Sequence, residues 1–502
     1  EPEHYASDAE FAAVAAFWEL SERTFPAAVV PPPLVGRLLH AAAEVPAFEA
    51  PASTADPSAY ARRVVARIPA VTTSVQSQAA AAVHTFLLNP NRDLGVAVAF
   101  AEGAVRCGFF ARVAAALNAL WRPHGSTRCR VASRGMLHAL NAVLEFAFVA
   151  SGDAIRSGVF EEVVARLWQL GAAKEGLPAE AAAAKDRNTD ADERHDETDC
   201  IQVVVTALRH TNHEVCERLR ALGAIDAIAR RPLRALHLDA LQRLTRPRAL
   251  GVEDVSDAVI RSLGRCLCND SGLWDPAAAA LNNLVGNDSS STVARVEALF
   301  AVPGVLERLY GGDADGASRL PCTTQTVRLA MNCCSASDAL TDKAFEAGML
   351  RPNVLASLWG VCPTAQLVLR DVLSGRPRWA AEAIRNGLPT LVHRALARSR
   401  VAQEQIAAAL CLETAVRECD EASAVSACFA GGLVNALSTA LCTTKNPDLK
   451  RAVIAACSAL AMRDRSAFAR EVHLNAPRLR DALERHHEAV LDTAASAAAR
   501  AT

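Results

Sequence analysis

The residues best suited to chemistry are arginines, and they concentrate in one block of the chain. Residues 201–250 contain nine arginines against four acidic residues, a net charge of +5, whereas residues 151–200 contain six basic and twelve acidic residues, a net charge of −6. Guanidinium groups bind carboxylates and phosphates through paired hydrogen bonds. The block therefore predicts a binding stretch for RNA phosphates or an acidic peptide, made of Arg230, Arg231, Arg234, Arg243, Arg246 and Arg248.

Two other interpretations of this block stay open. In the first, the arginines are solvated helix faces that pair with the acidic residues preceding them in the chain. In the second, residues 186–199 cover the arginines until a more negative partner displaces them. Deleting residues 186–199 and measuring salt-dependent binding to RNA distinguishes this autoinhibition from the other two interpretations.

A second basic patch surrounds a tryptophan. Its residues are Arg376, Arg378, Trp379 and Arg385, within a longer run that also includes Arg370, Arg394, Arg398 and Arg400. A tryptophan beside arginines stacks a nucleic-acid base or clamps a peptide when it is exposed. The chain has only six Trp and three Tyr, so packing at a junction between helices is the competing interpretation for Trp379.

Motifs that would indicate an enzyme are missing from the sequence. It contains no GxxxxGK[ST], GxGxxG, GxSxG, HExxH or CxxC. Cys266 and Cys268, and the adjacent Cys333 and Cys334, have neither the spacing nor the context of a zinc site, and we expect them to act as small buried apolar residues. His486 and His487 are adjacent on a helix and do not share a face. We therefore expect no catalytic residues, no metal, no cofactor and no small-molecule substrate.

The composition indicates an aliphatic helical protein. Apolar residues make up 51% of the 502-residue chain and aromatic residues 5%, with alanine abundant throughout. Alanine favours helices and disfavours strands. The net charge of −2 argues against a surface devoted entirely to nucleic acid. No uncharged run approaches the roughly 18 residues of a membrane span, so we expect no membrane insertion.

Cysteine usage and the first residue bear on the compartment. The 15 cysteines are scattered through apolar segments without a disulfide framework, which favours an intracellular, reducing compartment. The chain begins at Glu1. The cytoplasm is the first expectation, and the mitochondrial matrix after removal of a leader is the alternative.

A pattern of helix, glycine and second helix recurs along the chain. Before each glycine there is also an Ala-rich segment typical of a buried helix, which closes on a polar turn. Glycine ends a helix in the left-handed conformation and lets the chain turn into the next one. Spacings of 50, 65, 81, 44, 39 and 45 residues separate Gly108, Gly158, Gly223, Gly304, Gly348, Gly387 and Gly432.

These segments resemble the armadillo-repeat family of helical repeat proteins. The closest matches are AAAALNNLVGND followed by ALFAVPGVLERLY, and the run from Ala383 through Leu437. The resemblance covers roughly residues 70–485 and implies an all-α fold, a right-handed α-solenoid of eight or nine three-helix units. Such arrays serve many functions, so the resemblance specifies architecture rather than activity.

Five regions follow from the repeat pattern and its interruptions. We expect a helical N-terminal cap over 1–68, armadillo-like repeats over 69–171, an acidic disordered insertion over 172–199, further repeats over 200–485, and a C-terminal helix or tail over 486–502.

The resemblance also implies a residue-level test. In peptide-binding armadillo arrays an Asn on the innermost helix of each unit binds the backbone of an extended ligand, and in nuclear-import receptors a Trp stands four residues earlier. The matching asparagines here are Asn141, Asn283 and Asn332, and the earlier positions hold Leu137, Ala279 and Arg328. The tryptophans are missing, so we do not expect a continuous peptide ladder of the import-receptor kind. The alternative is that the asparagines bridge or cap within the helix stack.

The sequence therefore favours a non-enzymatic scaffold that holds a protein partner, or a subunit of a larger assembly, on the concave face of the array. The alternative is an RNA-binding component of a ribonucleoprotein or mitochondrial RNA-processing complex that uses the arginines of 209–248.

Overall fold

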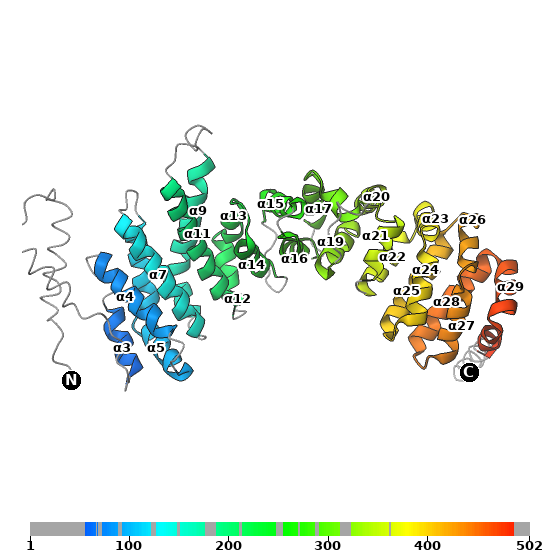
Figure 1. The fold of residues 1–502 in the computed structure, drawn as a ribbon, viewed down its shortest axis with the longest axis horizontal. Helices are drawn as coiled ribbons and strands as arrows, with labels where there is room; N and C mark the ends of the chain where they lie inside the picture. The colour runs from blue at the N-terminus through cyan, green and yellow to red at the C-terminus, as the bar shows by residue number, and fades with distance from the viewer. Residues whose placement is uncertain are drawn as a thin grey trace, which may run out of the picture. The chain divides into compact units, whose positions relative to one another are not determined.

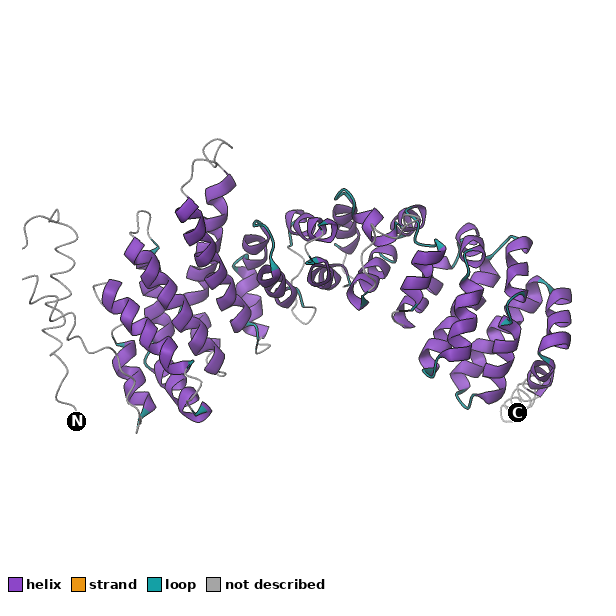
Figure 2. Cartoon of the chain, in the orientation of Figure 1, coloured by secondary structure: helices purple, strands orange, loops and turns teal. Residues whose placement is uncertain are grey.

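Every element that the computed structural model describes is a helix, and the described residues contain no strand (Figure 2). The description covers residues 56–66, 68, 73–88, 93–121, 127–147, 151–175, 187–209, 213–246, 255–269, 272–286, 291–311, 323–360 and 363–485. The prediction of an all-α chain is confirmed over these residues. Residues 1–55 of the expected cap, the tail at 486–502 and Arg248 lie outside them.

The chain divides into two compact units, Glu1–Val259 and Ile260–Thr502, whose helices are labelled in Figure 1. Helix α15 (Asp257–Cys268) spans the boundary between them. It lies in the 81-residue interval between Gly223 and Gly304, the longest interval of the glycine pattern.

In the first unit, long helices that we call ladder helices pack one on the next in chain order. They are α4 (Thr73–Leu87), α7 (Thr127–Phe146), α11 (Arg187–Ala207) and α14 (Ala235–Leu244). The helices between them are α5 (Leu94–Arg106) and α6 (Phe109–Leu120), α8 (Ser151–Arg156) and α9 (Val159–Glu175), and α12 (His213–Ala221) and α13 (Ala224–Ala229). Helix α3 (Pro57–Val65) precedes them and packs on α5, with the ring of Tyr60 5.7 Å from that of Phe100.

The second unit repeats this order. Its ladder helices, again packed in sequence, are α16 (Trp274–Val285), α19 (Thr324–Cys334), α22 (Pro363–Leu373), α25 (Ala402–Glu418) and α28 (Pro447–Arg463). The intervening helices are α17 (Thr292–Phe300) and α18 (Val305–Tyr310), α20 (Asp338–Glu346) and α21 (Pro352–Trp359), α23 (Pro377–Arg385) and α24 (Leu388–Arg398), α26 (Ala422–Ser426) with η2 (Ala427–Phe429) and α27 (Leu433–Thr443), and finally α29 (Arg465–Asn475). The described helices from α4 to α13 and from α16 to α27 thus follow one recurring triplet order, whereas α3, α14, α15, α28 and α29 do not form complete triplets.

The glycine turns are as the sequence predicts. All seven glycines of the repeat pattern have positive φ, from 76° at Gly108 and Gly223 to 109° at Gly348. Each one separates the two helices of an intervening pair. At Gly387 the backbone has φ 101° and ψ 14°, and a Cβ atom there would have no atom within 4 Å. Backbone conformation rather than space therefore favours glycine at this position.

We expect Gly387→Ala to destabilise the second unit by about 1–2 kcal/mol, because an L-residue pays this cost in the left-handed region. Gly360→Ala is the matched control, since Gly360 has φ −77° and a Cβ there would make only an ordinary contact. The control should be neutral or stabilising by up to about 1 kcal/mol. Urea unfolding of both variants measures this, and equal stability of the two would contradict the assignment.

The described parts of the acidic segment 172–199 are helical, where its composition suggests a disordered insertion. Residues 172–175 end α9, and residues 187–199 form the first part of α11. Asp196 and Glu197 on this segment are buried. The prediction of disorder was wrong for these residues because it rested on the number of charged residues. The groups that pair with Asp196, Glu197 and Asp199 lie on other helices and cannot be found from the composition of the segment. Residues 176–186 lie outside the described residues.

The cores lie between the ladder helices and the intervening pairs, and the cysteines belong to them. Cys266, Cys333 and Cys334 are buried, as expected of small apolar residues, whereas Cys268 is half-buried. Burial raises the pKa of the Cys334 thiol to about 12. A thiol with this pKa stays protonated at neutral pH and is a poor nucleophile or metal ligand.

None of the described helices is by itself long and apolar enough to cross a membrane. Two bent pairs reach that length and composition only when joined: Leu94–Arg106 with Phe109–Leu120, bent by 67°, and Ala422–Phe429 with Leu433–Thr443, bent by 59°.

Candidate interaction surfaces

The exposed side of the ladder helices in the first unit carries paired charges. Arg134 Nε and His138 Nε2 of α7 lie 3.1 and 3.2 Å from the carboxylate of Asp199 on α11. Further along the chain, Arg209 Nη1, two residues after the end of α11, donates to Glu145 Oε1 near the end of α7 at 2.9 Å. Later residues of one helix meet later residues of the other, so α7 and α11 run side by side in the same direction. Their charges largely neutralise one another.

Between these charged pairs lies one asparagine that the sequence singles out. Asn141 follows His138 by three residues and is half-buried, and its Oδ1 is enclosed without a hydrogen-bond partner. Its amide forms no hydrogen bond with any described residue. A half-buried amide without partners is unusual in a folded chain. Because Oδ1 is enclosed, Nδ2 is the group of Asn141 that can bond to a ligand, by donating to an acceptor such as a peptide carbonyl oxygen.

Sequence reasoning missed two glutamines that continue this row. Gln202 follows Asp199 by three residues, as Asn141 follows His138, so the two amides occupy matching positions on α7 and α11. The third amide, Gln242, is on α14. His237 of α14 bonds to Glu197 of α11, and each of these residues is followed five positions later by a glutamine, Gln242 and Gln202. The two glutamines therefore occupy matching positions on α14 and α11. A search for asparagine alone cannot find them. A search for any amide at this half-buried position would.

In the second unit the asparagines bridge helices. Asn332 Nδ2 of α19 donates to Asn282 Oδ1 of α16 at 3.2 Å, and Asn282 Nδ2 donates to the carbonyl oxygen of Gln325 at 2.7 Å. Asn283, the residue that matches the ligand-binding asparagine of peptide-binding armadillo arrays, is half-buried beside Asn282. The donor group of Asn332 is therefore used within the chain, in agreement with the bridging interpretation.

Arg231, the centre of the basic block, is buried and not part of a surface stretch. Its side chain is 6% exposed, and its Nη1 lies 3.6 Å from Glu197 Oε2. His237 Nε2 donates to the other oxygen of Glu197 at 2.8 Å. Burial alone raises the pKa of Glu197, but the hydrogen bond from His237 and the charge of Arg231 lower it below its ordinary value. This corrects the sequence prediction, because a charge this deep needs its counter-ion inside the chain.

The other described arginines of the block have different surroundings. Arg230 lies over the ring of Trp168 at 4.3 Å, and Arg243 Nε donates to Asp239 at 2.8 Å. Arg234 is exposed at the first residue before α14. The backbone carbonyl oxygen of Arg246 accepts a hydrogen bond from Arg220 Nη2 at 3.1 Å. The described arginines thus mostly serve contacts within the chain.

Three acids of α11 reach three different neighbours. Asp199 faces α7 and Glu197 faces α14, while Asp196 accepts a hydrogen bond from Arg166 Nη2 of α9 at 2.7 Å. Burial raises the pKa of Asp196, although the bond from Arg166 opposes this. These three acids connect α11 to three neighbouring helices.

Trp379 is a packing residue and not an exposed platform. Its ring is buried and its centroid lies 5.1 Å from that of Phe345 on α20. Its Nε1 donates to Asp342 Oδ1 at 3.0 Å. Arg378 covers the outer side of the ring at 4.5 Å. The stacking interpretation of this tryptophan is therefore wrong, because α20 and Arg378 already occupy its surfaces.

Acids also neutralise the other two arginines of the second basic patch. Arg376 pairs with Asp338 and donates to the carbonyl oxygen of Val372 at 2.8 Å. Arg385 Nη1 donates to Glu421 Oε2 at 3.0 Å. The patch connects neighbouring helices instead of presenting free charge.

In the described part of the chain, no three His, Cys, Asp or Glu side chains gather as metal ligands. The His84 and His138 rings lie 5.4 Å apart, with Asp199 beside the second. Burial lowers the pKa of His84, and the neighbouring His138 lowers it further.

Comparison with known proteins yields likeness in structure and none in sequence family. No protein-family model and no curated protein matches the sequence. An engineered protein solved by the Northeast Structural Genomics Consortium is similar, with a TM-score of 0.59 and 14% identity over 85% of this chain and 98% of its own. A second engineered protein from that consortium aligns with 80% of this chain and 97% of its own at 12% identity, with a TM-score of 0.24. The first likeness concerns the fold alone and is compatible with a helical repeat family.

Proposed function

We propose that this chain is a non-enzymatic scaffold of the armadillo type that holds an extended segment of a protein partner along the ladder helices of its first unit. The finer architecture belongs to the same proposal: a right-handed solenoid of eight or nine three-helix units. Its support is the recurring triplet order, the positive-φ glycines and the amides at matching positions of stacked ladder helices.

The observation that carries the proposal is the unpartnered amide of Asn141. Around it, Arg134 is paired with Asp199 and Arg209 with Glu145, so the surface has little net charge to attract a polyanion. An extended peptide backbone offers the alternating N–H and C=O groups that an amide satisfies. Gln202, whose Nε2 donates to Thr206 Oγ1 at 3.3 Å, is the next amide in the row.

RNA binding through residues 209–248 has less support as a function. Arg209 bonds to Glu145, Arg218 to Glu161 and Arg231 to Glu197. A phosphate would have to compete with these acids, and displacing Glu197 would leave it buried without its partner.

A peptide-selection experiment tests the scaffold function. A displayed library of random peptides is selected on the purified full chain, and the affinities of the selected peptides are measured against variants. Asn141→Ala should weaken binding by about 2–10-fold, because one hydrogen bond contributes roughly 0.5–1.5 kcal/mol. Asn435→Ala, an exposed amide in the second unit, is the matched control and should leave affinity unchanged.

Hydrogen exchange then maps the bound peptide. Protection of α7 and α11 supports the proposal. Selected peptides that bind both variants equally and protect other helices, or a library that yields no ligand, would overturn it.

A further inference from the structure

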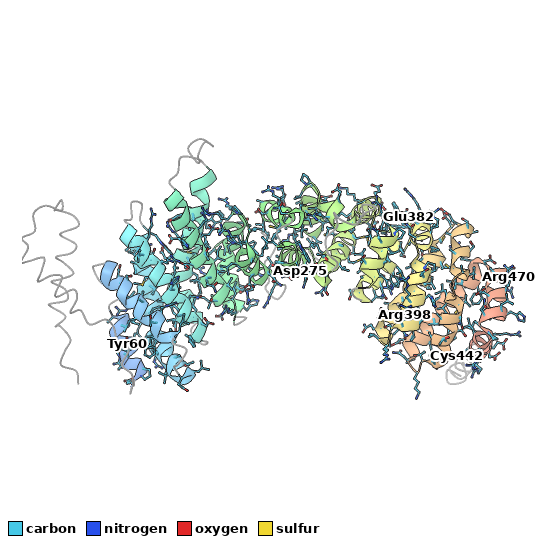
Figure 3. All side chains as sticks on the ribbon, in the orientation of Figure 1. Tyr60, Asp275, Glu382, Arg398, Cys442 and Arg470 are labelled. Carbon is cyan, nitrogen blue, oxygen red and sulfur yellow. The ribbon has the colours of Figure 1, made fainter. Side chains whose placement is uncertain are left out.

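The second unit has a basic surface that lacks acidic residues. It covers the exposed sides of α24 and α27, which pack against each other. We call it the α24–α27 face, and its exposed polar residues are Thr390, Arg394, Arg398, Arg400, Asn435, Thr439, Thr443 and Lys445. Arg398 is labelled on this part of the unit in Figure 3.

Acids are absent from the helices that build this face. Neither α24 nor α27 contains Asp or Glu, and residues 383–403 and 422–447 contain none either. Helix α21, which packs on α24, is also free of acids. Following Arg400, the first acid is Glu404, which already accepts a hydrogen bond from Ser399 Oγ at 2.5 Å. The α24–α27 face therefore has a local excess of positive charge although the chain as a whole is nearly neutral.

Its arginines have no partner within the described chain. Arg394, Arg398 and Arg400 are exposed and form no ion pair or hydrogen bond there, unlike Arg376 and Arg385 of the second basic patch. These arginines are not needed to cap the C-terminal end of α24, because another side chain donates to the carbonyl oxygens there.

That donor is a glutamine of the next helix. Gln405 Nε2 donates to the carbonyl oxygens of Leu396 and Ser399 at 3.1 and 3.0 Å. Arg394 and Arg398 are four residues apart, a spacing at which like charges repel. An anionic group between them would convert this repulsion into attraction.

We propose that the α24–α27 face binds the phosphate backbone of a nucleic acid. Hydroxyl and amide donors, such as Thr390, Thr439 and Asn435, lie among the cations, and this mixture is typical of phosphate and sugar contacts. A protein interface instead has apolar and aromatic residues at its centre. Helices α24 and α27 contain no Phe, Tyr or Trp. For the same reason the face offers no platform for bases, and recognition is independent of sequence.

The salt dependence of binding follows from the number of cations. Four phosphate contacts, by Arg394, Arg398, Arg400 and Lys445, give a slope of log affinity against log salt of about −2.8 for a single strand and about −3.6 for a duplex. Affinity should therefore fall roughly 50- to 150-fold between 50 and 200 mM salt.

Fluorescence anisotropy with a labelled 20-nucleotide oligouridine and a 20-base-pair RNA duplex tests the proposal on the full chain. The variant R394E/R398E should lose at least about 10-fold in affinity at 50 mM salt and reduce the slope by about 1.4–1.8. The matched control is R465E/R470E, which makes the same charge change at two exposed arginines of α29; Arg470 is labelled in Figure 3. This control should lose less than about 3-fold.

Three outcomes would overturn the proposal. The first is no binding of either RNA at 50 mM salt, and the second is equal losses for both double variants. The third is tighter binding of polyglutamate than of RNA with equal charge, which would assign the face to an acidic protein. All four substituted residues are exposed, so unchanged thermal unfolding verifies that the variants are folded. The proposal is independent of peptide binding by the first unit.

Discussion

Replacing Glu197 by alanine is expected to destabilise the first unit by about 3–5 kcal/mol, because it leaves the buried guanidinium of Arg231 without a counter-ion. Arg231 Nε and Nη2 already lack hydrogen-bond partners, so the remaining donors cannot compensate for the loss. His237 Nε2 would lose its acceptor as well. Because a chain with two units need not unfold in one step, hydrogen exchange of α11 and α14 is the appropriate measurement.

Glu102→Ala is the control for this prediction. Glu102 and Arg106 form an exposed pair at 3.9 Å, and such pairs contribute about 0–1 kcal/mol. Similar exchange rates in the two variants would show that Glu197 is solvated and that Arg231 is not dependent on it.

The same contact predicts a pH dependence with a defined sign. The pKa of Glu197 is lowered from its ordinary value of 4.5, so its ionisation stabilises the fold above that pH. This stability is lost as the pH falls through the lower pKa of the folded chain. Asp196 acts in the opposite direction: its pKa is raised, so its ionisation opposes folding and its protonation relieves the penalty. Glu197→Ala should therefore flatten the acid side of the stability curve, which urea unfolding at pH 3–7 measures.

This cluster also bears on autoinhibition by residues 186–199. A segment that covers a binding surface and can be displaced should contact it through exposed groups. Glu197 instead meets Arg231 inside the first unit, where both side chains are less than 10% exposed. We therefore expect deletion of the segment to destabilise α11 and its neighbours rather than to release a functional surface.

Trp379→Ala is expected to destabilise the second unit by about 3–5 kcal/mol, the range for removing a large aromatic side chain from a core. The substitution removes the contact with Phe345 and leaves Asp342 without the donor Nε1. Arg378→Ala is the matched control, since it removes only the cation above the ring, worth about 0.5–1 kcal/mol at an exposed site. Hydrogen exchange of α20 and α23 measures both.

The opposite result has a clear meaning. If Trp379→Ala weakens ligand binding while exchange in α20 and α23 stays unchanged, the tryptophan is a ligand platform after all. A large loss of protection with unchanged binding supports packing as its role.

The local features of the fold could be predicted from the sequence. Positive φ at Gly387 and the other repeat glycines follows from what a single residue type permits, and alanine-rich segments favour helices wherever they lie. Each of these features depends only on neighbours within one or two turns of helix, so it can be read from a short segment of sequence. Their regular recurrence along the chain indicates a repeating array.

The roles of the charged and amide side chains could not be predicted in this way. Arg231 and Arg394 are both arginines within basic runs, yet one is buried against Glu197 and the other is exposed with no partner among the described residues. Asn332 bonds to Asn282, a residue 50 positions earlier, while Asn141 has no such partner. Composition and spacing describe which charges a segment carries. Whether a charge is available to a ligand depends on what the neighbouring helix places opposite it, and only packing brings those residues together.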